Sequence, residues 1–291
     1  MDDLIELPDG SLLCGHGFKV CGLCCVDFSF MDESSESPED SDEEYDPEVA
    51  ERGRMHMLRA LHAGFMASHD NEQCGSWCVF PTKFTPPSIA STPKDLFKIG
   101  LGGQATTPSP RFIRRNNPKQ LLIYADGACL NNGQANPKAG WASVFGPDDG
   151  LSRIVSTRLE NKGPSGKEAT QTSNRAELRA VIGALRFRAW YGEGFAELVL
   201  ATDSEYVAEG ATSWVRRWVH NGWKTRAGGE VKNKDLWERL LGDIKLSNDR
   251  GLKIQFWRIP RALNEAADRA AKQGAAKEEQ DEFAVINGVL I

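Results

Sequence analysis

The stretch LLIYADGACL, residues 121–130, carries an aspartate directly after a run of mostly apolar residues. A short apolar run followed by a turn signal predicts a buried central strand, so we expect a strand that ends at Asp126 and a turn at Gly127. An ionised carboxylate inside an apolar sheet costs several kcal/mol unless a partner compensates its charge. Taken alone, Asp126 is most simply interpreted as a turn aspartate that hydrogen-bonds its own backbone.

The same pattern recurs at LVLATD, residues 198–203, where a second apolar run ends in Asp203. If the two strands are parallel neighbours, both carboxylates lie at the edge where open α/β sheets bind their ligands. Glu177 and Asp268 each fall early in a predicted helix. Singly, either of these two would be an ordinary surface or capping residue. Two strand-terminal aspartates in one small sheet favour a cluster of all four acids instead.

Converging carboxylates repel one another unless cations lie between them, and hard divalent ions prefer such oxygen ligands. Two ions roughly 4 Å apart would activate a water molecule and stabilise the leaving oxygen in phosphodiester hydrolysis. The acids therefore predict a metal-dependent site that cleaves a phosphodiester.

The chain from Lys119 onward alternates strand and helix patterns. Five strands are expected at residues 121–126, 141–147, 151–160, 196–203 and 252–259, and helices at 173–191, 205–220, 233–246 and 264–277. Three successive strands, then helix, strand, helices, strand and helix, predict an α/β fold. Its mixed sheet would be an antiparallel meander extended by crossovers into parallel strands.

Composition limits the class of protein. The chain has 291 residues, is 40% hydrophobic and carries a net charge of −6, which argues against indiscriminate binding to nucleic acid. No apolar run approaches the roughly 20 residues that span a bilayer. The acidic start MDDLIELPDG is unlike a secretory signal. We therefore expect no membrane association and an intracellular location, in the nucleus or the cytoplasm.

Four motifs in this order resemble type 1 ribonuclease H, the endonuclease that cuts the RNA strand of RNA/DNA hybrids: YADGACLNNG, QTSNRAELRAVIGAL, ATDSEYV through VKNKDLW, and NEAADRAAK. The resemblance covers residues 118–276, about half the chain. It implies a ribonuclease H-like fold, a five-stranded mixed sheet with helices on both faces. It also implies that an acidic quartet, Asp126, Glu177, Asp203 and Asp268, binds two Mg²⁺ ions, for which Mn²⁺ can substitute.

The resemblance also implies contacts to the substrate. Residues matching Cys129, Asn132 and Asn174 would line the minor groove, and those matching Thr172 and Asn233 would hold a phosphate of the DNA strand. Without the family match, Thr172 and Asn233 are equally consistent with turn-forming residues. The set as a whole favours a hybrid substrate over DNA alone, and small residues after Asp126, starting with Gly127, would let the backbone approach the sugars.

The segment SWVRRWVHNGWKT, residues 213–225, interleaves tryptophans with cations and resembles the basic protrusion of the family. Arg216, Arg217 and Lys224 are its candidate phosphate contacts. The tryptophans are better explained as residues that pack into the core.

The segment WRIPRALNEAAD, residues 257–268, departs from the family. Many members carry a histidine in a loop just before the last aspartate, whereas this stretch is short and has none, as in fungal, plant-like and archaeal relatives. Either Arg258 or Arg261 could supply part of the missing positive charge. The departure concerns the rate of turnover more than the type of reaction.

The first part of the chain has a different composition. We divide the sequence into a Cys/His-containing segment at 1–30, an acidic linker at 31–48, a short helix and Pro/Ser/Thr-rich loop region at 49–117, the ribonuclease H domain at 118–276 and a tail at 277–291. The acidic linker, which has no lysine or arginine, is expected to be disordered, or else to act as an interaction tail.

The N-terminal cysteines allow two interpretations. Cys14, His16, Cys21 and Cys24 are candidate Zn²⁺ ligands, because Cys21 and Cys24 have the C-x₂-C spacing of tetrahedral sites. The full spacing matches no strong zinc-finger pattern, and the cysteines could be small buried residues or part of a module that docks a protein partner. We expect a monomer. The rival function is a catalytically weak nucleic-acid-binding or adaptor protein that retains the fold.

Overall fold

The computed structural model describes residues 79–103, 109–147, 153–286 and 288, together with the backbone of four two-residue strands nearer the N-terminus. These strands form two antiparallel pairs, β1 (Ile5–Glu6) with β2 (Leu12–Leu13) and β3 (Val20–Cys21) with β4 (Val26–Asp27). Cys14, His16 and Cys24, the side chain of Cys21, the acidic linker and the helix expected after residue 49 lie outside the described residues, so the zinc site, the linker and that helix stay predictions. None of the described helices is long and apolar enough to cross a membrane.

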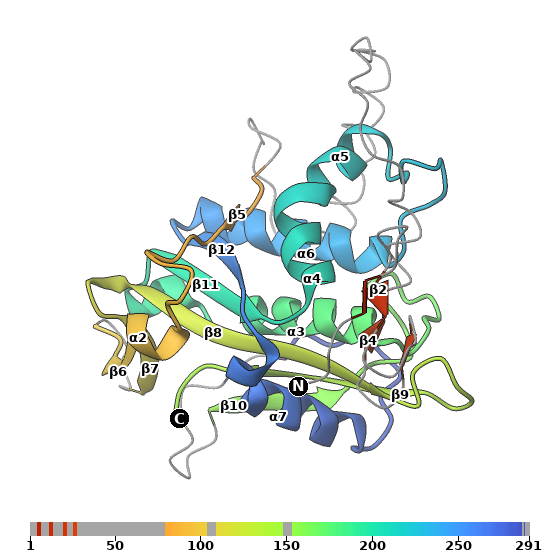
Figure 1. Ribbon diagram of the computed structural model, residues 1–291, viewed down its shortest axis with the longest axis horizontal. Helices are drawn as coiled ribbons and strands as arrows, with labels where there is room; N and C mark the ends of the chain where they lie inside the picture. The colour runs from red at the N-terminus through yellow and green to blue at the C-terminus, as the bar shows by residue number, and fades with distance from the viewer. Residues whose placement is uncertain are drawn as a thin grey trace.

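The five predicted strands are present and form the mixed sheet expected from the sequence (Figure 1). They are β8 (Asn117–Leu130), β9 (Lys138–Val144), β10 (Ile154–Arg158), β11 (Glu197–Thr202) and β12 (Lys253–Arg258). Strands β8, β9 and β10 form the antiparallel meander, and β11 lies parallel between β8 and β12. The α/β fold class is confirmed.

The sequence predicted a strand that ends at Asp126, but β8 is longer. It continues to Leu130, with Asp126 opposite Ala142 and Gly127 opposite Trp141 on β9. Gly127 is needed for packing rather than for a turn, because a Cβ atom there would lie 2.1 Å from the backbone nitrogen of Glu177. The glycine therefore brings the next helix into contact with the strand.

Residues 82–114 also belong to the sheet, although the sequence predicted mainly loop for this region. Strand β5 (Thr82–Lys83) pairs parallel with β12, and β6 (Phe97–Leu101) and β7 (Pro110–Arg114) form a hairpin that pairs with the start of β8. The sheet thus has eight strands. The short helix α2 (Pro93–Leu96) begins with a capping box between Thr92 and Asp95. Frequent prolines and short strands concealed these elements.

This N-terminal addition covers one face of the sheet with aromatic rings. The ring centroids of Phe84 and Trp257 lie 4.8 Å apart, and those of Phe97 and Trp257 lie 6.5 Å apart. All three residues are buried together with Leu122 and Val199 from the central strands. The addition is therefore part of the domain core, although the resemblance to the family begins only at residue 118.

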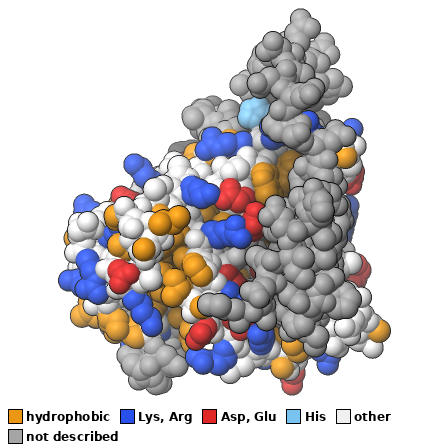
Figure 2. All heavy atoms as spheres, viewed as in Figure 1, with side chains coloured by type: hydrophobic (Ala, Val, Ile, Leu, Met, Phe, Trp, Pro, Cys, Tyr) orange, Lys and Arg blue, Asp and Glu red, His pale blue; other side chains and the backbone are white. Residues whose placement is uncertain are grey.

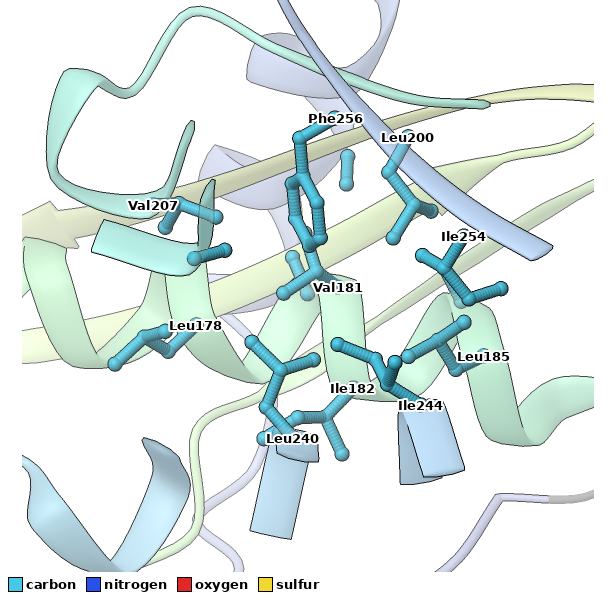
Figure 3. Close-up of a cluster of buried hydrophobic side chains, with 14 of the residues drawn as sticks. Leu178, Val181, Ile182, Leu185, Leu200, Val207, Leu240, Ile244, Ile254 and Phe256 are labelled. Carbon is cyan, nitrogen blue, oxygen red and sulfur yellow. The ribbon is translucent and has the colours of Figure 1, made fainter. Parts of the chain in front are cut away.

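The main core lies on the opposite face, under α3 (Ser173–Phe187) and α6 (Lys234–Asp249). Figure 3 shows leucine, isoleucine and valine side chains of both helices meeting Leu200, Ile254 and Phe256 of the sheet. Helix α4 (Glu205–Glu209) passes through one π-helical turn, η3 (Gly210–Trp214), into α5 (Val215–His220).

Helix α7 (Glu265–Ala275) follows a short 3-10 turn, η4 (Arg261–Leu263). It covers the face of the sheet opposite to α3 and α6. Its small residues Ala270 and Ala271 pack against Ala128 and Ala142. A second 3-10 turn, η2 (Trp190–Glu193), follows α3. Helices therefore lie on both faces, as predicted.

The described part of the C-terminal tail is packed against the domain. Arg179, whose side chain pairs with the buried Glu160, also donates to the carbonyl of Ala284 at 2.6 Å and stacks on the ring of Phe283. The ion pair of Lys162 with Glu282 holds the same segment. Residues 287 and 289–291 lie outside the described residues, so for them the expected tail stays a prediction.

Candidate active site

The structure brings the acidic quartet to one edge of the sheet. Strands β8 and β11 run parallel with Tyr124 opposite Ala201; Asp126 lies two residues further along β8, and Asp203 directly follows β11. Glu177 lies in the second turn of α3, which Gly127 holds against β8, and Asp268 lies in the first turn of α7. The two predicted helices therefore deliver their acids to the edge that the two strands define.

Electrostatics links the four carboxylates. Asp126 is only 5% exposed, and the pKa of its carboxyl is raised well above the ordinary value. Burial is the largest cause, and the negative charges of the other three acids add to it, while Arg261 acts in the opposite direction. The negative charge is thus only partly compensated by the protein itself.

Neighbouring polar side chains hold the other carboxylates in place. The hydroxyl of Ser204 donates to Glu177 Oε2. The amide of Asn264, which is 1% exposed, donates from Nδ2 to Asp203 Oδ1 at 2.6 Å and to the carbonyl of Ala125 at 3.2 Å. Sequence reasoning gave neither Ser204 nor Asn264 a role at the site. Their positions beside Asp203 and at the start of α7 were the available signals.

Asp268 is held by two cations. Arg261 Nη2 lies 2.9 Å from Asp268 Oδ1, and Lys272 Nζ lies 2.9 Å from Asp268 Oδ2. Although burial lowers the pKa of Arg261, the surrounding carboxylates raise it above its ordinary value. Arg258 instead pairs with Glu205 at 2.9 Å. Of the two arginines considered from the sequence, Arg261 is the one that contacts the quartet.

The quartet fits divalent cations by its chemistry. Four carboxylates offer hard oxygen donors, and because burial and the other three acids raise the pKa of Asp126, a cation bound there would favour its ionised form. Within the described residues, no three His, Cys, Asp or Glu side chains already have the arrangement of a metal site. Each of Glu177, Asp203 and Asp268 is bonded to a protein donor instead.

The residues predicted to line the groove have little exposed side chain. Cys129 is fully buried, with its Sγ 3.6 Å from the carbonyl of Gln171. Asn132 and Asn174 are 2% and 7% exposed, and Nδ2 of Asn132 finds no hydrogen-bond partner in the described part of the chain. A contact from Cys129 to a sugar would therefore come from its backbone.

Thr172 and Asn233 lie at the start of α3 and of α6. Thr172 is the N-cap of α3, and its Oγ1 accepts from the backbone nitrogen of Arg175 at 3.3 Å. The side-chain oxygen of Asn233 lies 3.5 Å from Nη1 of the same Arg175. Arg175 thus links the two predicted phosphate contacts. The sequence did not reveal this link.

In the protrusion, Trp223 is buried, Trp214 and Trp218 are partly buried against the core, and the cations are exposed. Trp223 is 1% exposed, and Trp218 packs edge-on against Trp237 with ring centroids 5.4 Å apart, so the core interpretation of the tryptophans is confirmed. Arg217 and Lys224 are exposed to solvent. Arg216 is also exposed, and its guanidinium lies 4.7 Å from the centre of the Phe80 ring.

Comparison with known proteins agrees with this architecture. The RNase H family model matches residues 118–276. The chain is 37% identical over 158 residues to ribonuclease H of Neorickettsia sennetsu, which covers 54% of this chain and 94% of that protein. It is 36% identical over 166 residues to human ribonuclease H1, covering 55% of this chain and 51% of the human protein.

Among solved structures, a type 1 RNase H with the type 2 active-site motif is 30% identical, with a TM-score of 0.36 over 54% of this chain and 72% of that chain. The family model spans more than half of the sequence and includes all four acids of the quartet. The chain therefore belongs to the RNase H family.

Proposed function

We propose that this protein is an endoribonuclease that hydrolyses the RNA strand of RNA/DNA hybrids at the acidic quartet. The observation that carries the proposal is the convergence of acids at the ends of two paired parallel strands, where the buried Asn264 bonds both Asp203 and the carbonyl of Ala125, next to Asp126. Ribonuclease H relatives at 36% and 37% identity support the reaction class. A scaffold that concentrates negative charge in this way is suited to binding cations.

Two Mg²⁺ ions held by the quartet would supply an activated water and stabilise the leaving oxygen. The water oxygen would attack phosphorus while the bond from phosphorus to the ribose O3′ breaks, leaving a 5′-phosphate and a 3′-hydroxyl. Asp126 and Asp203 would face this centre from the rigid strands. Ser204 and Asn264 would keep Glu177 and Asp203 oriented during the step.

Recognition of the hybrid would use contacts away from the reacting phosphate. Thr172 and Asn233 offer neutral donors to a phosphate of the DNA strand, which positions the duplex without reading its sequence. The exposed cations Arg216, Arg217 and Lys224 would add salt-dependent attraction to phosphates. Gly127, Cys129, Asn132 and Asn174 would lie toward the minor groove, where the 2′-hydroxyl distinguishes RNA from DNA.

A catalytically weak binding protein with the same fold is the rival. The presence of all four acids, with ordered donors on three of them, favours an enzyme. A protein partner or a zinc ion for residues 1–30 stays a prediction from the sequence.

A cleavage assay tests the proposal. End-labelled RNA/DNA hybrid, double-stranded RNA and double-stranded DNA are incubated with the full chain in Mg²⁺ and in EDTA. We expect cuts in the RNA strand of the hybrid only, and only with metal. Equal cleavage of double-stranded DNA, or no cleavage of hybrid at any Mg²⁺ or Mn²⁺ concentration, would contradict it.

A further inference from the structure

A partly buried ion pair joins the two helices that Thr172 and Asn233 cap at their N-termini. Arg175 lies in the first turn of α3 and Asp235 in the first turn of α6. The guanidinium donates from Nη1 to Oδ1 at 2.8 Å and from Nη2 to Oδ2 at 2.5 Å, and Arg175 is only 5% exposed. Two parallel hydrogen bonds fix both the separation and the rotation of the two helix ends.

A third segment rests on the same ion pair. A Cβ atom on Gly163 would lie 2.2 Å from Asp235 Oδ2 and 2.6 Å from Arg175 Nη2. The backbone of the loop that leads into Thr172 therefore packs directly on the pair, where only glycine fits. The position of the start of α3 is thus defined from two sides.

The hydrogen bonds at Thr172 determine which group it can offer. Its Oγ1 already accepts the backbone N–H of Arg175 as the N-cap of α3. A hydroxyl carries one hydrogen in addition to its acceptor sites. The hydrogen of this hydroxyl can therefore donate to an anion in front of the helix.

The orientation of the Asn233 amide is also determined. The hydroxyl of Tyr206 donates its single hydrogen to the carbonyl of Lys232 at 3.2 Å and accepts from Trp237 Nε1 at 3.0 Å. Asn233 must therefore turn its NH₂ group toward Tyr206, at 3.1 Å, and its oxygen toward Arg175. The second N–H of that amide is then available to donate to another group.

We propose that Arg175, paired with Asp235, is the positioning residue for a donor pair made of Thr172 Oγ1 and Asn233 Nδ2. The inference rests on the proposed function, in which this donor pair holds a phosphate of the DNA strand. Because the charge of Arg175 is buried and neutralised by Asp235, the arginine acts through the two donors and does not touch the phosphate. Its loss weakens binding of the hybrid and leaves the cleavage step intact.

The test couples Arg175 to one phosphate of the substrate. A set of hybrids carries a single uncharged methylphosphonate at successive positions of the DNA strand, and KM and kcat are measured for the wild-type chain, Arg175→Lys and Asp235→Asn. We expect one position at which the wild-type KM rises about 3- to 10-fold. Both variants should already show that higher KM on unmodified hybrid, gain nothing further from the modification, and keep a near-normal kcat.

Arg239→Lys is the matched control, because it disturbs another ion pair of α6, with Asp243 at 3.0 Å, away from the donor pair. It should respond to the methylphosphonate as the wild type does. Circular dichroism is recorded first, and if Arg175→Lys does not fold, Asp235→Asn, whose side chain is 29% exposed, carries the test.

Two results would overturn the inference while the wild type cleaves hybrid normally. One is that the modified phosphate costs the variants as much as it costs the wild type. The other is a fall in kcat at unchanged KM, which would place the effect at the acidic quartet. Failure of the wild type to cleave any hybrid would overturn the proposed function, and this inference with it.

Discussion

Asn264 ties Asp203 to the strand that carries Asp126, since its Nδ2 donates both to Asp203 Oδ1 at 2.6 Å and to the carbonyl of Ala125 at 3.2 Å. The amide is buried at the start of α7 and bonds to a group at each of the two strands. It therefore fixes the distance between the two strand-borne carboxylates of the site.

Replacing Asn264 by alanine should weaken metal binding more than folding. Loss of a hydrogen bond to a charged group costs about 1.5–3 kcal/mol, so we expect the Mg²⁺ concentration for half-maximal cleavage to rise by roughly tenfold or more. Titrations of cleavage rate and of Tm against Mg²⁺ measure the change. Asn248→Ala, at an exposed position near the end of α6, is the control. An unchanged Mg²⁺ dependence in Asn264→Ala would show that the amide does not position Asp203.

Substitution of Asp126 by asparagine should separate activity from stability. The amide removes a metal ligand at almost constant volume, so cleavage should fall by roughly a hundredfold or more. The carboxyl has a pKa raised well above its ordinary value, so its contribution to stability is present at low pH and is lost as the pH rises through that raised pKa. In EDTA, Asp126→Asn should therefore have a higher Tm than the wild type at pH 8 and a similar Tm at low pH.

Added Mg²⁺ should reverse that order by stabilising the wild type more than Asp126→Asn. Asp249→Asn, at a half-exposed position at the end of α6, serves as the control and should follow the wild type. Parallel Tm curves for Asp126→Asn and the wild type at every pH would mean that the quartet exerts no repulsion on Asp126.

The four acids could be found from the sequence because each one stands next to a local signal. Asp203 follows an apolar strand, and Glu177 follows the cap of a long amphipathic helix. Asn264 and Arg175 could not be assigned in this way, because their roles depend on partners more than 50 residues away in the chain. Tertiary contacts of this kind leave no periodic pattern.

The strands of the addition, β5, β6 and β7, were missed for a different reason. Strand β5 has two residues and β6 has five, and prolines and glycines interrupt the segment, so neither strand shows a long alternating pattern. The capping box of Thr92 with Asp95, followed by alternating Phe97, Ile99 and Leu101, was the available signal. On the face drawn in Figure 2, hydrophobic side chains gather over the region of this addition. Ile99 and Leu101 of β6 are 60% and 58% exposed.

Removal of the addition should destabilise the domain. A chain that begins after the addition lacks Phe84 and Phe97, which cover Trp257. A chain of residues 118–291 should lose at least about 3 kcal/mol of stability relative to residues 79–291, because large aromatic core residues are deleted. Urea unfolding of the two chains measures the difference.

The buried salt bridge of Arg111 with Glu193 adds to this effect, since its loss leaves Glu193 paired only with Arg188 among the partners described for it. The longer chain, residues 79–291, should retain full cleavage of hybrid. Equal stability of the two chains would contradict a structural role for the addition.

Glu238, in the second turn of α6 and four residues after Lys234, should make stability depend on pH near neutrality. Burial raises the pKa of its carboxyl to about 7, against the opposing charge of Lys234. A carboxyl whose pKa is higher in the folded state stabilises the fold below its unfolded pKa, and this stabilisation is lost as the pH rises through about 7. Glu238→Gln removes the ionisation, so at pH 8 its Tm should exceed that of the wild type by about 2–4 °C, after allowance for screening of a partly exposed group. At pH 5 the two proteins should melt within error of each other.

The measurement is a series of thermal melts from pH 5 to pH 8.5, with the exposed Glu278→Gln as the control. A difference between Glu238→Gln and the wild type that stays constant across this range would show that Glu238 does not titrate near neutrality in the folded protein.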